Sequence, residues 1–211
     1  MNRKWNEYRN VLKIIGKYYS REQYGNPEYL HSKEYKRYKK ILEDKALFKK
    51  KQKEYYDMLR AVFPHYYVKR WDNMTYPCLQ FSILLHKDQP ILDDDVELMD
   101  ALGGKRYNLD VFISRISNYY YACTFEHIYN PGQDFEHEWM FDSHGAAYAL
   151  EKKYLKRLKR EMEKKGMSKL SRAVAHSKVP FIETELLPDP EHNYEVRMFN
   201  CLFSDMVTDY Y

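Results

Sequence analysis

Apolar side chains recur every three or four residues through the first third of the chain, which is the spacing of one face of a helix. This pattern predicts a helix over residues 3–24 and a second, longer helix over residues 28–62. Gly25 and Pro27 separate the two, because glycine and proline end helices. Within the longer pattern, the acidic pair at 43–44 is a candidate break. The first part of the chain is therefore expected to be helical.

Beyond residue 64 the pattern changes to short runs rich in aromatic and β-branched residues, which are typical of strands. Three such runs follow one another closely between residues 107 and 142, and this order predicts an antiparallel meander. Helical spacing returns in three further stretches. The predicted strands cover residues 65–71, 77–86, 107–117, 118–129, 135–142, 180–187 and 194–203, and the predicted helices cover residues 94–102, 144–165 and 168–176.

Helices, then strands, then a helix and again strands are the order of an α+β fold. We expect an antiparallel sheet, made of the meander and the C-terminal strands, with amphipathic helices packed on one of its faces. The chain has 211 residues, only 7 Gly and 8 Pro, and no linker-like segment. It therefore fits a single domain, with a helical N-terminal part in residues 1–63 and an α+β core in residues 64–211.

The stretch FEHIYNPGQDFEHEW repeats Phe-Glu-His on the two sides of an expected turn. If residues 130–134 form that turn, His127 faces His137 and Phe125 faces Trp139. Two adjacent imidazoles can bind a metal or act as a pH-sensitive pair. The nearby carboxylates are expected on the opposite face, and no HExxH or zinc-finger spacing is present. We therefore interpret the two as packing residues and keep His127 and His137 as a candidate metal site.

Composition indicates a folded protein and bears on the cellular compartment in which we expect it. The hydrophobic share is 44% and the charged share is 31%, which argues against wholesale disorder. Cys78, Cys123 and Cys201 are far apart and form no CxxC pair, so neither a disulfide framework nor a zinc knuckle is expected. We find no secretory signal and no apolar run long enough to cross a bilayer, and expect a cytoplasmic protein that contacts no membrane. The 22 tyrosines suit half-buried surfaces, interfaces and base stacking.

The net charge of +4 hides a sharp division along the chain. Residues 33–53 carry a net +7, residues 151–178 carry a net +8, and the remainder carries −11. One basic helix face is usually a solvated surface, but two basic blocks beside an acidic remainder favour a binding surface for an anionic partner. This interpretation depends on the two blocks meeting in the fold. The residues expected to bind the partner are Lys36, Arg37, Lys40, Lys152, Lys156, Lys159 and Arg160.

No pattern of a catalytic site is present, since the chain lacks GxSxG, P-loop, GxGxxG and kinase signatures. It also lacks a helix-turn-helix, a zinc finger and a ribonucleoprotein motif. The favoured interpretation is a non-catalytic protein that binds an anionic macromolecule through its basic helices, without a cofactor. The partner is an acidic protein surface or a nucleic acid, and a homo-oligomer is a further option. A nucleic-acid-binding protein and a metal-assisted enzyme centred on the histidine pair are the alternatives.

Overall fold

The computed structural model describes residues 3–20, 27–90, 96–128, 138–140, 146–182 and 196–204. Its centre is a sheet in which strands β1 to β5 are antiparallel neighbours in chain order, while β6 pairs in parallel with β4. The predicted α+β fold with an antiparallel meander is therefore confirmed. The strands are β1 (Val68–Trp71), β2 (Cys78–Leu84), β3 (Lys105–Ser114), β4 (Tyr119–Ile128), β5 (Glu138–Met140) and β6 (Ser168–Lys169).

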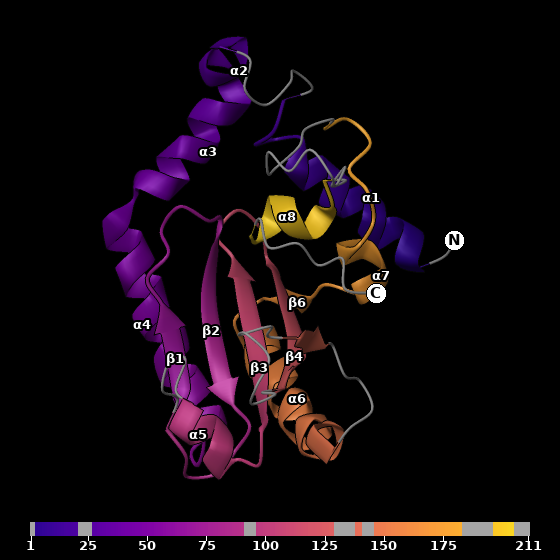
Figure 1. Ribbon diagram of the computed structural model, residues 1–211. Coiled ribbons are helices and arrows are strands. Elements are labelled where there is room, and N and C mark those ends of the chain that lie inside the picture. The colour runs from indigo at the N-terminus through magenta and orange to yellow at the C-terminus, as the bar shows by residue number, and fades with distance from the viewer. Residues whose placement is uncertain are drawn as a thin grey trace.

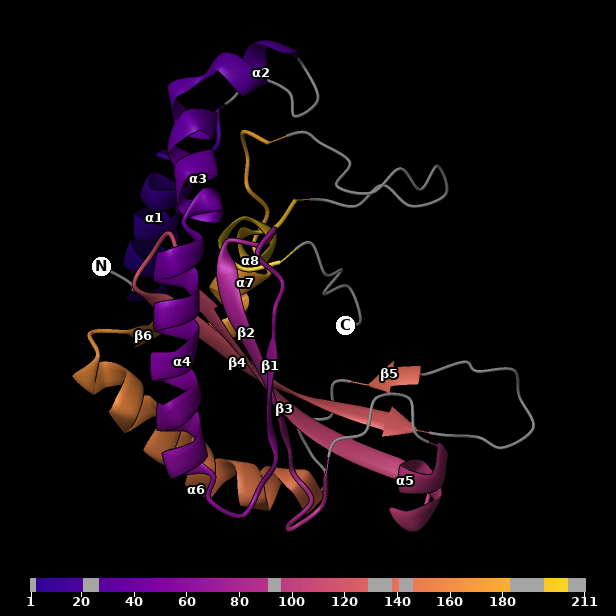
Figure 2. The same ribbon diagram turned by 90° about the vertical axis from the view of Figure 1, so that its left-hand side faces the viewer.

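Helices surround this sheet, and two of them form a long bent rod. In Figures 1 and 2, α3 continues above α4 along the side of the molecule, and α6 crosses near the lower end of α4. Helices α1, α7 and α8 gather at the other end of the sheet (Figure 1). The helices are α1 (Arg3–Ile15), α2 (Pro27–His31), α3 (Lys33–Glu43), α4 (Lys45–Val62), α5 (Val96–Ala101), α6 (Ala146–Lys164), α7 (Arg172–Ala175) and α8 (Met198–Leu202).

Alternation along the strands creates an apolar cluster on each face of the sheet. Leu109 and Val111 of β3 join the first cluster, to which α4 contributes Leu59 and α6 contributes Leu158. Phe112 belongs to the second cluster, together with residues of α1, α7 and α8. Helices therefore pack on both faces of the sheet, whereas the sequence led us to expect them on one face. The reason is that the second face also carries apolar side chains, Cys78 of β2, Phe112 of β3 and Tyr121 of β4, so both faces need a cover.

The break predicted in the long helix is confirmed at Asp44, and a second break lies at Ser32. The side-chain oxygen of Ser32 accepts a hydrogen bond from the Tyr35 amide at 3.1 Å. That of Asp44 accepts one from the Leu47 amide at 2.9 Å. Both residues thus cap the N-terminus of the helix that follows. Three helices, α2, α3 and α4, therefore replace the single predicted one.

The first predicted helix is shorter than expected. It was predicted over residues 3–24 but ends at Ile15. Tyr19 was included in the predicted helix but lies beyond α1 and donates its hydroxyl hydrogen to the Cys201 carbonyl at 2.9 Å. A tertiary hydrogen bond and burial thus account for an apolar position that the helical pattern had included. Residues 21–24 lie outside the described residues.

The strand predicted over residues 194–203 is wrong, because Met198–Leu202 form helix α8. Phe199 and Phe203, one turn apart, both lie against Phe112, with ring centroids at 5.2 and 6.3 Å from it. In a short run that is apolar at almost every position, a buried helix and a buried strand look alike. Contacts with the sheet therefore decided the secondary structure of this segment.

Two further predictions near the C-terminus are also corrected. The helix expected over residues 168–176 is limited to α7, because residues 168–169 form β6. Of the strand expected over residues 180–187, residues 180–182 form no strand, and the rest lies outside the described residues. Within the described segments, residues 178 and 197 form an isolated bridge in place of the predicted C-terminal strands.

Candidate functional site

Four of the predicted partner-binding residues, Lys152, Lys156, Lys159 and Arg160, are exposed on α6. Leu158 and Met162 of the same helix are fully buried against the sheet, so these basic side chains lie on the sides of α6 that face away from it. Among them, Lys159 pairs with Glu163 at 3.7 Å and Arg160 pairs with Glu161 at 3.5 Å. Carboxylates on the same helix thus neutralise part of this group.

The other three predicted residues, Lys36, Arg37 and Lys40, are exposed on α3, a helix without buried residues. Arg37 already has a structural contact, because its Nη1 donates to the Lys17 carbonyl at 2.7 Å. This bond ties α3 to the turn that follows α1. Arg37 therefore has a role within the fold that the sequence did not indicate.

The seven residues do not form one patch. Both views place α3 near the top of the molecule and α6 near the bottom (Figures 1 and 2). The first basic block, however, extends from α3 into α4, and α4 packs against the same face of the sheet as α6. The part of the first block that packs beside the second is therefore α4, and α3 lies apart from it.

The outward sides of α4 and α6 are both basic. Lys165, just after α6, pairs with Glu54 of α4 at 2.6 Å, and its hydrogen bond lowers the pKa of that carboxyl. This contact and the common apolar cluster hold the two helices side by side. We define the α4–α6 surface as the exposed cations Lys49, Lys50, Lys53, Lys152, Lys153, Lys156, Lys159 and Arg160.

One arginine of the second basic block, Arg157, forms hydrogen bonds within the fold. The Nη2 of Arg157 donates to the Ala61 carbonyl at 2.8 Å, and its Nη1 donates to the Val62 carbonyl at 3.3 Å. Both carbonyls belong to the last turn of α4, where no further helical amide can reach them. A cation at this position also interacts favourably with the helix dipole. Arg157 is therefore a C-terminal cap of α4.

We expect Arg157→Gln to lower the free energy of unfolding by about 1 kcal/mol, because the cap of α4 loses a charged donor. Urea unfolding followed by circular dichroism measures the change. Lys156→Gln is the matched control, since it removes an exposed cation from the next position without touching a carbonyl. Equal losses in the two variants would contradict the capping role.

The predicted histidine pair has a different register. Position 127 of β4 pairs with Trp139 of β5, so the expected pairing of His127 with His137 is wrong by two residues. The last pair of this ladder is Ile128 with Glu138, so the connection is longer than the expected turn. A shift of two residues leaves every position on the same face, and for this reason the aromatic pattern could not determine the register.

The metal hypothesis gains no support from this geometry and stays a prediction. His137 and the side chain of His127 lie outside what the structure describes. Among the residues that are described, no group of three or more His, Cys, Asp or Glu side chains could hold a metal ion.

A buried carboxyl group in the sheet escaped the sequence reasoning. Asp110 of β3 is only 8% exposed, and its Oδ1 has no hydrogen-bond partner among the described residues. Burial raises the pKa of Asp110 to about 7, although hydrogen bonds with Ser82 and Gln80 and the charge of Arg106 lower it in part. An aspartate in the middle of an apolar strand was the available signal. This group can take up a proton near neutral pH.

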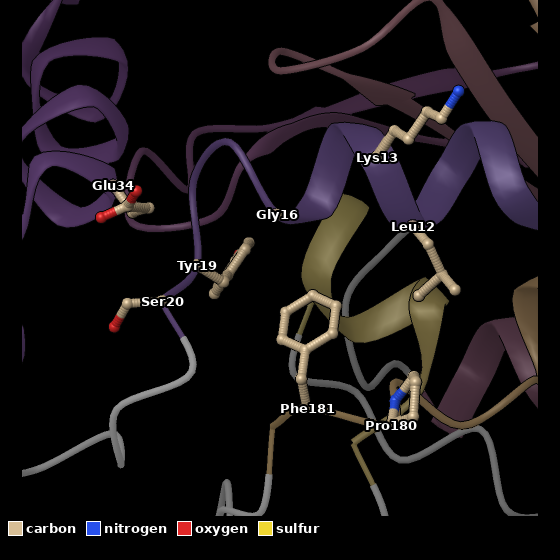
Figure 3. A pocket seen from close by; sticks show the side chains of 8 residues that line it. All are labelled: Leu12, Lys13, Gly16, Tyr19, Ser20, Glu34, Pro180 and Phe181. Carbon is tan, nitrogen blue, oxygen red and sulfur yellow. The ribbon is translucent and has the colours of Figure 1, made fainter.

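A hollow of about 520 Å³ lies where α1, α3 and residues 180–181 approach one another. Figure 3 shows Phe181 and Leu12 on its apolar side, and Lys13 turned away from Phe181. No two titratable side chains converge among the lining residues that the figure labels, so the hollow offers space without a visible catalytic arrangement. Its lining is Leu12, Lys13, Gly16, Tyr19, Ser20, Glu34, Pro180 and Phe181.

Comparisons with protein-family models, with curated proteins and with solved structures gave no match for this chain. Function therefore has to be inferred from the geometry of the chain alone. None of the helices in the described segments is both long enough and apolar enough to cross a membrane.

Proposed function

We propose that this chain is a non-catalytic protein that binds an anionic macromolecule through the α4–α6 surface. The observation that carries the proposal is the common packing of α4 and α6. Each helix buries an apolar stripe in the same cluster on one face of the sheet, through Phe48 and Leu59 of α4 and Leu158 of α6. The basic sides of both helices consequently face solvent over that face of the sheet.

Several cations of this surface have no ion-pair partner among the described residues. Lys49, Lys50, Lys153 and Lys156 are exposed, and none of them forms an ion pair within the described segments. Like charges gathered on one side repel one another, and a polyanion that binds there relieves this repulsion. It also releases its condensed counterions, which favours binding at low salt. An acidic protein surface and a nucleic acid both meet this requirement.

The proposed location is the cytoplasm. Cys78, Cys123 and Cys201 are free thiols, which agrees with a reducing compartment. A second copy of this chain is also a possible partner, because the residues outside the two basic blocks carry a net −11. Sedimentation at low and at high salt tests this option, since association between opposite charges weakens as salt is added.

We expect binding to labelled polyanions to weaken roughly 100-fold between 50 and 200 mM salt, as for a protein that neutralises about four phosphates. Fluorescence anisotropy with single-stranded DNA, duplex DNA and polyglutamate measures the affinity. The double variants Lys49→Gln/Lys50→Gln and Lys153→Gln/Lys156→Gln are each expected to bind about three- to tenfold more weakly than the unmodified protein.

The control is Arg9→Gln/Lys13→Gln, which removes two exposed cations from α1 and changes the net charge equally. It should alter the affinity less than twofold. Flat anisotropy with all three polyanions at 50 mM salt would refute the proposal. Equal losses in all three double variants would show that net charge, and not the α4–α6 surface, determines binding.

A further inference from the structure

Two arginines from different elements converge on one tyrosine ring beside the edge strand of the sheet. The Cζ atom of Arg60, in the last turn of α4, lies 6.0 Å from the centroid of the Tyr56 ring. The Cζ atom of Arg70, on β1, lies 5.4 Å from the same centroid. Guanidinium groups at this distance interact favourably with the ring. Tyr56, Arg60 and Arg70 are called the Tyr56 site below.

Neither guanidinium group has an anionic partner in the part of the chain that the structure describes. Arg60 and Arg70 are both exposed, and neither forms an ion pair with any described residue. The nearest acidic position on the α4 sequence is Asp57, and its carboxylate is already paired with Lys53 at 2.6 Å. Two like charges directed at one ring repel each other, so an anion that contacts both is stabilised. The planar donors of arginine match a phosphate group in two-point contact.

The surroundings of the site favour a polymer over a single anion. Lys49 and Lys53 are exposed on α4 within two turns before Tyr56, on the same broad side of the helix as Arg60 at 100° per residue. Of the two, Lys53 also pairs with Asp57. From Lys49 to Arg60 this row of cations extends about 16 Å along the helix axis. A chain with regularly spaced phosphates can contact the whole row, whereas one free phosphate can contact only a single point.

The aromatic ring distinguishes a nucleic acid from an acidic polypeptide. A tyrosine ring and the planes of arginine side chains are surfaces on which unpaired bases stack. We propose that the Tyr56 site binds a phosphate and the adjoining base of single-stranded nucleic acid. The inference rests on the proposed function, because it names the class of anionic partner and adds the edge of the sheet to the α4–α6 surface. It assigns a stacking role to Tyr56 and a phosphate-binding role to Arg60 and Arg70.

Three variants test the two roles separately. Arg60→Gln/Arg70→Gln removes the phosphate contacts and is expected to weaken binding of a single-stranded oligonucleotide of about 20 nucleotides by about 10- to 100-fold. It should also reduce the slope of log affinity against log salt by about one to two. Tyr56→Leu removes the stacking ring and is expected to weaken the same binding about fivefold or more. Tyr56→Phe keeps the ring and should bind like the unmodified protein.

The matched control for charge is again Arg9→Gln/Lys13→Gln on α1. If the arginine double variant loses no more affinity than this control, the Tyr56 site is wrong while the proposed function stands. Tyr56→Leu could weaken the binding of polyglutamate and of the oligonucleotide equally, or leave both unchanged. In either case the surface recognises charge alone and the nucleic-acid inference is wrong. Tighter binding of duplex than of single-stranded DNA also overturns it. Absence of binding to every polyanion refutes the proposed function itself. If Tyr56→Leu fails to fold, the exposed Arg70→Gln single variant and its salt slope still decide the phosphate role.

Discussion

Replacing Arg115 by methionine is expected to lower the free energy of unfolding by about 3 kcal/mol. This half-buried side chain follows β3 and donates to the carbonyls of Ile41 and Leu42, the latter at 3.5 Å. It also donates to the carbonyls of Met74 and Tyr76, at 3.3 and 3.4 Å. The first two carbonyls lie in the last turns of α3 and the others in the connection between β1 and β2. Methionine fills a similar volume but leaves these carbonyls without their donor.

Arg115 has a particular position in the fold, because it holds the bend between α3 and α4. Its Cζ atom lies 5.0 Å from the centroid of the Phe48 ring in α4, and burial lowers its pKa from the ordinary value. Arg115→Lys keeps the charge but has one ammonium group for carbonyls from two segments, so an intermediate loss is expected. Arg37→Met, which removes one exposed bond from α3, should cost less than about 1 kcal/mol. Urea unfolding of the three variants provides the comparison. A loss below that of Arg37→Met would contradict the bracing role of Arg115.

The second large effect is a pH dependence of stability caused by Asp110. Burial raises the pKa of this carboxyl from 3.8 to about 7 in the folded protein. Between these two pH values the folded state binds a proton that the unfolded state releases. The free energy of unfolding therefore falls as the pH rises from about 4 to about 7, by on the order of 4 kcal/mol. Above the folded pKa the contribution of this group stays constant.

Asp110→Asn keeps the size of the side chain and removes the ionisation. We expect the variant to be more stable than the unmodified protein at pH 8, by a few kcal/mol. At pH 4, where Asp110 is protonated in the fold, the two proteins should differ by less than about 1 kcal/mol. Urea unfolding at pH 4, 6 and 8 measures both differences. Asp57→Asn, at an exposed residue paired with Lys53, should leave the pH dependence in place. If the free energy of unfolding of Asp110→Asn still falls with pH as steeply as that of the unmodified protein, other groups cause the pH dependence.

Local signals in the sequence were enough for most of the elements. The apolar stripe of α4 and that of α6 are one-sided, and such a period is visible without any knowledge of the fold. The acidic pair at 43–44 was identified as a candidate break, and the structure shows Asp44 as the N-cap of α4. The meander was predicted because its strands are separated by short connections. These features depend on neighbours in the chain.

Other features were missed because they depend on contacts between distant segments. Met198–Leu202 became helix α8 through packing against β3, since its apolar run has no period of its own. The pairing of His127 with Trp139 depends on a connection whose length the aromatic pattern does not encode. The raised pKa of Asp110 is a result of burial by other elements, and the position of an aspartate within an apolar run could only have pointed to it.

In the candidate site, too, some features depend on neighbours in the chain and others on contacts between distant segments. The sequence by itself determined that two segments are strongly basic and that their helices have one apolar side, because charge and periodicity are properties of consecutive residues. Only the tertiary structure decided that α4, and not α3, lies beside α6. It likewise brought Arg70 from the edge strand to the ring of Tyr56. The physical reason is that side chains far apart in the chain meet only where the burial of apolar surface brings their elements together.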